Sequence, residues 1–391
     1  MRSILHLIHV TGPGGAETVC VDLVRGLDAS RWRHVVCVPE EGWITRELRR
    51  TGLEPVVLPT SDRAAFFRGL LRLVREQRID LVQGHLLGTA FYASLAGILA
   101  NVPVVNTFHG ASDVRLPRSF ANRVRYGVIR RGSAKVVLVS EPLHRELLDR
   151  RHLPAGGLAV IPNGIDTSVF RPRDDRGFRR EIGVEDHHVL VGAVGNLRGP
   201  KDYPTFLRAA ALLAERSPDY RFVVAGDDRG PLLGELVGLR DSLGLRDRVV
   251  FAGFRPDVER VLNALDTFVV SSSSEGFSLA AVQAMASGVP VVATRCGGPE
   301  EIFTHGRDGL LVPVGAPEEI AAAVERIRAD GELRDALVRA ALRRAADDFS
   351  AAGMVRRYEA LYLEALGLPA VGGRGGPGGA LDAEMAGVGR G

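Results

Sequence analysis

The 391-residue chain has only three cysteines, Cys20, Cys37 and Cys296, and they lie far apart in the sequence. This number and spacing exclude a disulfide framework and predict no zinc site, so we interpret them as inert thiols of a reducing compartment. The chain also lacks a strong excess of charge, because 50 Lys and Arg residues are balanced by 47 Asp and Glu residues. That balance argues against a dedicated nucleic-acid-binding protein, while leaving room for a local basic patch.

The sequence lacks an uninterrupted apolar run of membrane-spanning length. Residues 81–112 contain no Asp, Glu, Lys or Arg, but two histidines, an asparagine and a proline interrupt them. A buried helix, a turn and a buried strand fit this segment better than a membrane span. Residues 1–10 carry a single Arg, and no cleavage site of small residues follows, so we expect a first buried strand rather than a signal peptide.

Short runs of Val, Ile and Leu alternate with longer amphipathic stretches along the whole chain. Strands are predicted at 4–10, 34–38, 55–58, 80–83, 104–107, 135–139, 159–161, 189–194, 221–225, 249–252, 267–271 and 289–293. Helices are predicted at 17–27, 63–76, 87–100, 141–150, 205–216, 258–264, 279–286, 317–329 and 333–346. Near-continuous apolar strands that alternate with helices indicate an α/β protein with parallel sheets covered on both faces.

The polar, turn-rich segment 166–186 predicts a domain boundary. We expect an N-terminal Rossmann-like domain at 1–168 and a C-terminal Rossmann-like domain at 169–349. Two doubly wound domains in tandem place a cleft between them, with ligands at the carboxyl ends of the strands. The final segment, 367–391, contains ten glycines and is predicted to be disordered, because it buries too little apolar surface to offset its ordering entropy.

Two glycine-containing loops follow predicted strands and precede helices. Residues 11–17 (TGPGGAE) resemble a dinucleotide fingerprint, but Glu17 stands at the third glycine position, so a simple strand-to-helix turn is an equal alternative. Residues 195–201 (GNLRGPK) bring Arg198 and Lys201 to the carboxyl end of a strand. Two cations with glycines at such an edge suit a diphosphate, and the alternative is a solvated surface loop.

Residues 271–290 (SSSSEGFSLAAVQAMASGVP) form the most informative segment. A strand ends in a serine loop, Glu275 follows, and a helix is expected from about Ser278, whose free first amides suit phosphate or sugar oxygens. At ~1.5 Å per residue, eight helical steps from Glu275 to Gln283 span roughly 12 Å on one face. That separation matches the hexose and the ribose of a nucleoside diphosphate sugar. Taken alone, Glu275 also fits the role of a carboxylate that stabilises the N-terminus of a helix.

Three further segments complete the candidate features. His109 ends a first-domain strand at the expected cleft edge, before Gly110, although a lone His is often structural. The glycine turn at 296–301 is expected to open beside the helix at 279–286, towards the same cleft. The segment from Arg115 to Arg131 carries six arginines with almost no acid, and it suits either an amphipathic helix on anionic lipid or an ordinary solvated face.

Together these residues resemble the retaining glycosyltransferases of GT-B fold, specifically family 4. The resemblance covers about residues 2–366 and follows the family's motifs in order. The matching segments are GGAE at 14–17, TFHG at 107–110, IPNGID at 161–166, EGF at 275–277 with AMASGVPVV at 284–292, GGPEE at 297–301 and DGLLV at 308–312.

The resemblance implies a UDP- or GDP-linked sugar held mainly by the second domain, and a helix at 350–366 that crosses back onto the first. His109 would contact the transferred sugar, Glu275 its hydroxyls, and Lys201 the diphosphate. The family uses no metal, because cationic side chains and helix dipoles neutralise the leaving diphosphate, so no cofactor is expected. The implied donor-binding positions are Gly15, Arg198, Lys201, Phe254, Arg255, Phe277, Ser278, Leu279 and Gln283.

Two positions depart from the family pattern. Gln283 stands where the family has a glutamate, and an amide binds a ribose hydroxyl without the strengthening charge. Asn196 replaces the family's usual arginine, which Arg198 is expected to supply.

The expected activity is retaining transfer of a sugar from a nucleoside diphosphate to a hydroxyl of a carbohydrate, a lipid-linked molecule or a small molecule. We expect it to serve glycan, polysaccharide or glycolipid synthesis, in the cytoplasm or at the inner membrane face. The alternatives are a nucleotide-sugar epimerase of the same fold and a non-catalytic sugar-nucleotide-binding protein.

Overall fold

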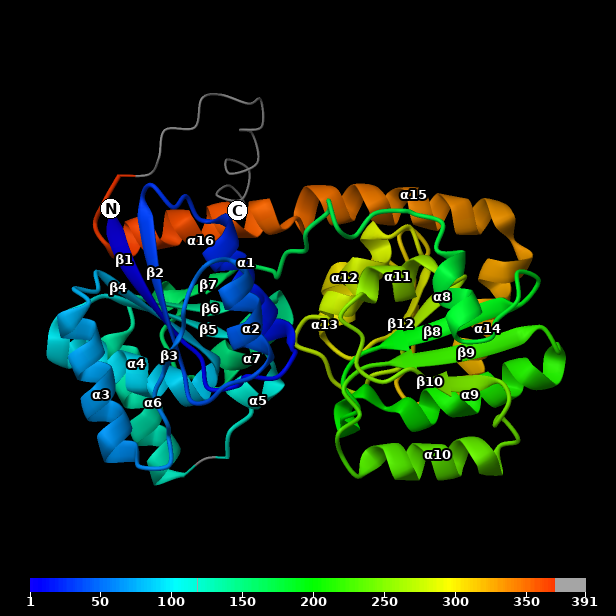
Figure 1. Ribbon diagram of the computed structural model, residues 1–391, viewed down its shortest axis with the longest axis horizontal. Helices are drawn as coiled ribbons and strands as arrows, with labels where there is room; N and C mark the ends of the chain where they lie inside the picture. The colour runs from blue at the N-terminus through cyan, green and yellow to red at the C-terminus, as the bar shows by residue number, and fades with distance from the viewer. Residues whose placement is uncertain (118, 370–391) are drawn as a thin grey trace, which may run out of the picture.

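The computed structural model describes residues 1–117 and 119–369, and it consists of two α/β lobes that lie side by side (Figure 1). Each lobe is built on a sheet whose strands all pair in parallel. The strand order is β3-β2-β1-β4-β5-β6-β7 in the first sheet and β10-β9-β8-β11-β12-β13 in the second. In both sheets the order reverses beside the first strand, which creates a switch point at the carboxyl edge where ligands of such folds bind.

The first lobe contains seven strands and most of the N-terminal helices. Its strands are β1 Arg2–Leu7, β2 Trp32–Val38, β3 Val56–Val57, β4 Leu81–His85, β5 Val104–Phe108, β6 Lys135–Leu138 and β7 Leu158–Val160. Its helices are α1 Gly15–Gly26, α2 Trp43–Arg50, α3 Arg63–Glu76, α4 Leu86–Ala100, α5 Ala111–Val114, α6 Phe120–Gly132, α7 Glu141–Asp149 and the short 3-10 turn Ala155–Gly157. Ile4 packs against α1 and Leu5 against α3 and α4, because neighbouring residues of a strand face opposite sides of the sheet.

The second lobe repeats this layering. Its strands are β8 Val189–Val194, β9 Tyr220–Ala225, β10 Val249–Phe251, β11 Thr267–Val270, β12 Val291–Thr294 and β13 Leu310–Val312. Its helices are α8 Arg176–Glu181, α9 Tyr203–Arg216, α10 Leu232–Ser242, α11 Val258–Asn263, α12 Leu279–Ala286, α13 Gly298–Ile302, α14 Pro317–Ala329 and α15 Gly331–Asp348, with a 3-10 turn at Gly199–Lys201. Helices α9, α10 and α14 lie together on one face, while α11, α12 and α15 cover the other.

The last helix, α16 Ala351–Ala365, leaves the second lobe and lies on the first (Figure 1). Ser350 caps its first turn by accepting a hydrogen bond from the amide of Gly353. Tyr358 and Tyr362 are fully buried in a cluster with Ile4 and residues of α1. This helix therefore packs on the first lobe and completes its core.

Several expectations need correction. Helices α2, α8 and α10 and strand β13 were not predicted, and α8 lies inside the segment 166–186 that was interpreted as a turn-rich domain boundary. Arg179 of α8 pairs with Asp266 at 2.6 Å, which ties the helix to the second lobe. Residues 367–369 were expected to be disordered, yet Leu368 packs against the core under α16. The rest of that prediction, 370–391, lies outside the described residues.

The segment at 81–112 forms β4, α4 and β5, so its expected strand and helix are confirmed. In the part of the chain that the structure describes, no helix combines the length and apolar character needed to cross a membrane.

Candidate functional site

Lys201 and Glu275 meet at the carboxyl edge of the second sheet. The Lys201 Nζ lies 2.6 Å from Oε1 of Glu275, and the same oxygen accepts a hydrogen bond of 2.6 Å from Ser272. The Glu275 side chain is mostly buried, but its Oε2 has no partner among the described residues. One carboxylate oxygen is thus held in place while the other stays available as an acceptor for a hydroxyl group.

The residue type at position 201 is unusual for this chain. Of its 50 Lys and Arg residues, 48 are arginine, and only Lys135 and Lys201 are lysine. Lysine presents a compact point charge with three donors instead of a planar fork. The loop fits this shape closely, because a Cβ on Gly195 would lie 3.0 Å from Cε of Lys201.

The helix after Glu275 begins later than the spacing estimate assumed. Helix α12 starts at Leu279, while Glu275 lies in extended backbone that forms a bridge with Gly297. The roughly 12 Å estimate from Glu275 to Gln283 used a helical rise throughout and is therefore wrong for the first four steps. The main-chain amides of Phe277 and Ser278 donate to no described residue. Leu279 is the first residue of α12, so its amide also lacks a hydrogen-bond acceptor within the helix. These three amides are therefore free donors at a helix start, as expected.

The glycine turn at 296–301, expected beside the helix at 279–286, pairs directly with Glu275. Glu275 donates its main-chain N–H to the carbonyl of Cys296 at 3.1 Å and accepts from the amide of Gly298 at 3.0 Å. Gly297 has a φ of +111°, which favours glycine because side chains with a Cβ are strained there. A Cβ on Gly298 would lie 2.9 Å from Cα of Phe277, so the close approach of these two loops depends on this glycine.

Three donor-binding candidates of the second lobe remain: Gln283, Phe254 and Arg255. Gln283 is half-buried on α12. Phe254 is exposed. The carbonyl of the preceding Gly253 accepts a hydrogen bond from the amide of Gly226 at 2.8 Å. Gly226 in turn lies against Gly195 of the loop at 195–201. The Arg255 side chain instead pairs with Glu181 and Asp257, so only its backbone remains available to a ligand.

The first lobe contributes the loop at 11–17. Gly15 is exposed at the start of α1, and a Cβ on it would meet open space. Glu17 behind it is buried, and burial raises its pKa to about 7, against a smaller opposite effect of its own main-chain hydrogen bond and of Arg198. The Arg198 side chain is exposed on the other lobe, and its charge acts on Glu17. The charge of Arg198 therefore lies close enough to the loop at 11–17 to act on its buried carboxyl group.

Among the described residues, two hydrogen bonds and one close backbone approach join the lobes near these loops. The side-chain amide of Asn196 donates to the carbonyl of Pro13 at 2.7 Å, and Glu301 accepts from the main-chain amide of Glu141 at 2.7 Å. The Gly276 backbone lies so close to His109 that a Cβ would come within 2.5 Å of its carbonyl oxygen. These contacts describe a closed arrangement of the lobes, and sequence reasoning identified none of them.

His109 follows β5 and lies at this interface. Its main-chain amide donates to Oδ2 of Asp113 at 2.8 Å, while the other oxygen of Asp113 accepts from the amide of Leu87. Burial holds the pKa of His109 well below its ordinary value, and His85 acts in the same direction. A neutral ring positions and donates hydrogen bonds rather than supplying charge.

Sequence reasoning did not single out Asp113, which holds the backbone beside His109. It fixes the loop that carries His109, and its carboxylate at the third position of the short helix α5 bonds back to the amide of Gly110. The sequence signal for this capping contact was an acidic residue three positions after the glycine that precedes the helix.

The arginine-rich segment forms α6, and its outer surface includes Phe120, Val124 and Arg123. Arg115 pairs with Glu146, and Arg118 lies outside the described residues. An exposed aromatic and an exposed aliphatic side chain beside arginines suit a lipid surface. The same helix also fits the alternative of an ordinary solvated face.

Comparison with known proteins agrees with this geometry. Residues 13–169 match the family model described as Glycosyltransferase Family 4, and residues 174–344 match that of Glycosyl transferases group 1. The chain is 32% identical over 346 residues to the D-inositol 3-phosphate glycosyltransferase of Corynebacterium jeikeium, which covers 83% of this chain and 81% of that protein. It is 27% identical over 305 residues to the UDP-Gal:alpha-D-GlcNAc-diphosphoundecaprenol alpha-1,3-galactosyltransferase of Escherichia coli, covering 75% of this chain and 78% of that one.

Solved structures share the architecture. HepE of Anabaena, crystallised in complex with UDP-glucose, superposes with a TM-score of 0.84 at 24% identity, covering 93% of this chain and all of that one. The lipopolysaccharide glycosyltransferase WaaG gives a TM-score of 0.72 at 17% identity, covering 92% and 99%. Two parallel-sheet lobes with a glycine loop in each are the GT-B fold. The chain belongs to the family 4 glycosyltransferases, the glycosyl transferases group 1 of GT-B fold.

Proposed function

We propose that the protein transfers a sugar, with retention of anomeric configuration, from a UDP- or GDP-linked donor to a hydroxyl acceptor. The observation that carries this proposal is the Lys201–Glu275 pair at 2.6 Å beside the free amides at the start of α12. A cation and helix amides suit a diphosphate, while the unpartnered oxygen of Glu275 suits sugar hydroxyls. UDP-linked sugars are the first donors to test, because HepE was crystallised with UDP-glucose and the Escherichia coli relative is named for UDP-Gal.

In this reaction the bond between the sugar C1 and the diphosphate oxygen breaks, and the diphosphate leaves with the electron pair. The acceptor oxygen bonds to C1 on the same face, and its proton passes to an oxygen of the leaving phosphate. Lys201, Arg198 and the amino end of α12 stabilise the developing charge without a divalent metal. His109, being neutral, donates to the sugar, and Gly15 lets the first loop approach the phosphate.

Gln283 is assigned to the ribose, and the backbone around Phe254 and Arg255 to the base. The lobe contacts at Gly276 and Asn196 support a reaction that takes place with the lobes closed, which excludes water from the donor. Asn196 occupies the position of the family's arginine and is used here to join the lobes, so Arg198 remains the available guanidinium.

Thermal-shift measurements with UDP, GDP, ADP and their sugars identify the donor, because a ligand that binds only the native state raises its melting temperature. Incubation with the same panel then separates the activities. Free nucleoside diphosphate supports transfer or donor hydrolysis, a new nucleotide sugar indicates an epimerase, and binding without turnover indicates a sensor. Glu275→Gln should retain nucleotide binding and lose most turnover, and full activity of this variant would contradict the assigned site.

We further propose that the protein works in the cytoplasm at a membrane surface, on a lipid-linked or sugar-phosphate acceptor in glycan synthesis. Exposed Phe120 and Val124 on α6 support this location, and the Escherichia coli relative is named for a diphosphoundecaprenol acceptor. The full chain should cosediment with vesicles of anionic phospholipid. The double variant Phe120→Ser, Val124→Ser should remain in the supernatant, and equal sedimentation of both proteins would refute the contact.

A further inference from the structure

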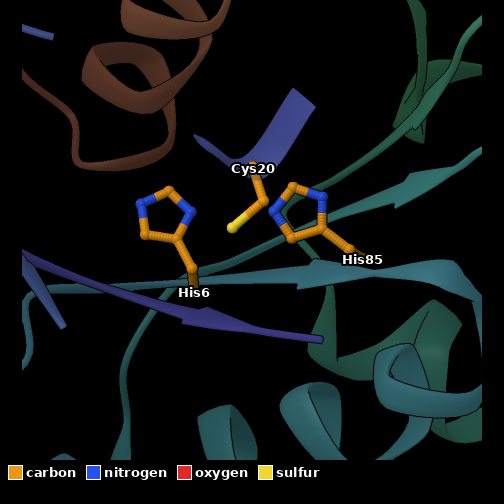
Figure 2. A group of neighbouring side chains, drawn as sticks. All are labelled: His6, Cys20 and His85. Atoms are coloured by element: carbon orange, nitrogen blue, oxygen red, sulfur yellow. The ribbon is translucent and has the colours of Figure 1, made fainter. Parts of the chain in front are cut away.

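Three potential metal ligands converge inside the first lobe, away from the carboxylate and lysine of the donor site. His6 comes from β1, Cys20 from α1 and His85 from the end of β4 (Figure 2). All three side chains are fully buried. One ligand atom from each lies within 4.8 Å of those of the other two.

The nitrogens that face the cysteine have no hydrogen-bond partner. Among the described residues, Nδ1 of His6 and Nε2 of His85 are buried and unbonded, and Figure 2 shows both pointing towards the sulfur of Cys20. A buried polar atom without a hydrogen-bond partner destabilises the folded state. Two such atoms aimed at one point indicate that a group absent from the protein chain belongs between them.

The opposite nitrogens of both rings are already engaged. Nε2 of His6 lies 3.0 Å from Nδ1 of His34, and Nδ1 of His85 lies 3.4 Å from Nε2 of His109. Histidines that bind metals usually use their second nitrogen in this way, which fixes the tautomer and the orientation of the ring. The four rings form a row across β2, β1, β4 and the end of β5.

We propose that His6, Cys20 and His85 bind one zinc ion. Two imidazoles and one thiolate are ligands that zinc prefers, with bonds of about 2.0–2.1 Å to nitrogen and about 2.3 Å to sulfur. Such bonds space the ligand atoms roughly 3.5 Å apart, so these three, now within 4.8 Å of one another, must draw together by about 1 Å. Binding displaces the thiol proton to solvent, and a water molecule completes the coordination.

Zinc at this position would also set the state of a residue at the lobe interface. An ion on Nε2 of His85 leaves the proton of that ring on Nδ1, which then donates to Nε2 of His109. His109 must then carry its own proton on Nδ1. The ion would thus act on the proposed sugar site by positioning, without contacting the donor.

The test uses the full chain without a metal-binding affinity tag. We expect about one zinc per chain by elemental analysis after growth in zinc-supplemented medium and dialysis. Growth in cobalt-supplemented medium should give a protein with visible tetrahedral d–d absorption and a thiolate-to-cobalt charge-transfer band. Supplying the ion during synthesis avoids the difficulty of entry into a closed core.

Cys20→Ala and His85→Gln should lose the bound metal, with circular dichroism confirming the fold. Cys37→Ala is the matched control, since Cys37 is also a buried free thiol but lies outside the group, and it should keep both metal and charge-transfer band. Wild-type protein without metal from either medium would overturn the proposal and leave a packed row of neutral histidines. A charge-transfer band that persists in Cys20→Ala would also overturn it, by assigning the thiolate to another cysteine such as Cys296.

Discussion

Gly276→Ala tests the closed arrangement of the lobes. The new methyl group would lie 2.5 Å from the carbonyl oxygen of His109 and 2.7 Å from Cα of Gly110, whereas ordinary contact begins at 3.4 Å. Both obstacles are backbone atoms, so neither can rotate away, and the lobes must separate by about 1 Å. A misplacement of that size costs about 100-fold in rate, which corresponds to about 2.7 kcal/mol of transition-state stabilisation.

Release of nucleoside diphosphate from the donor named by the thermal-shift screen gives kcat/KM for this variant. The control is Gly238→Ala on the surface of α10, where a Cβ meets nothing within 4 Å, and its kcat/KM should stay within about twofold. Nucleotide binding to the second lobe alone should persist in Gly276→Ala. A kcat/KM within threefold of the wild type would show that catalysis does not need the observed contact between the lobes.

Three further predictions concern charged and polar side chains. Lys201→Ala should lower kcat/KM about 100-fold, as expected for loss of a group that stabilises the charge of the leaving diphosphate. The control, Lys135→Ala, removes a cation paired with the exposed Glu364 and should change kcat/KM less than about twofold. Gln283→Glu should bind the nucleotide about fivefold tighter in titration calorimetry, because a carboxylate bonds a ribose hydroxyl more strongly than an amide does; weaker binding would remove this residue from the ribose site. Burial raises the pKa of Glu17 from 4.5 to about 7. Between these pH values the folded state binds a proton that the unfolded state has lost. The free energy of unfolding therefore falls as pH rises from 4.5 to 7, by about 3 kcal/mol at most. Glu17→Gln should flatten this fall in denaturant titrations at pH 5 and pH 8, and an unchanged slope would refute the buried carboxyl as its cause.

Local sequence patterns were sufficient for much of the fold. Helix α12 has the predicted bounds, because an apolar, alanine-rich run lies between Ser278 and the helix-ending Gly288. Helix α10 was missed because it contains two glycines and buries only Leu236, so it lacks the apolar stripe that identifies a helix. The short helix α2 buries only three residues and was too brief for its period to stand out.

The second-lobe site was predictable in residues but not in geometry. Lys201 and Glu275 are 74 positions apart, and their pairing follows from the parallel order of β8 and β11. The contact between Asn196 and Pro13 joins residues 183 positions apart, and no local pattern encodes it. The scattered cysteines argued against a zinc site, since spacing rules recognise ligands from one loop, whereas the fold brings Cys20 between histidines of two different strands.

The position of α16 has a consequence for how the chain is made. Tyr358 and Tyr362 fill the core that contains Ile4, and Trp32 donates its indole N–H to Glu359 at 2.9 Å. A ribosome must therefore translate past residue 365 before the first lobe receives its last buried side chains, whereas the second lobe has its final helix by residue 348. The lobe that is synthesised first is thus the last to complete its core, and a nascent chain carries that unfinished surface until α16 has been made.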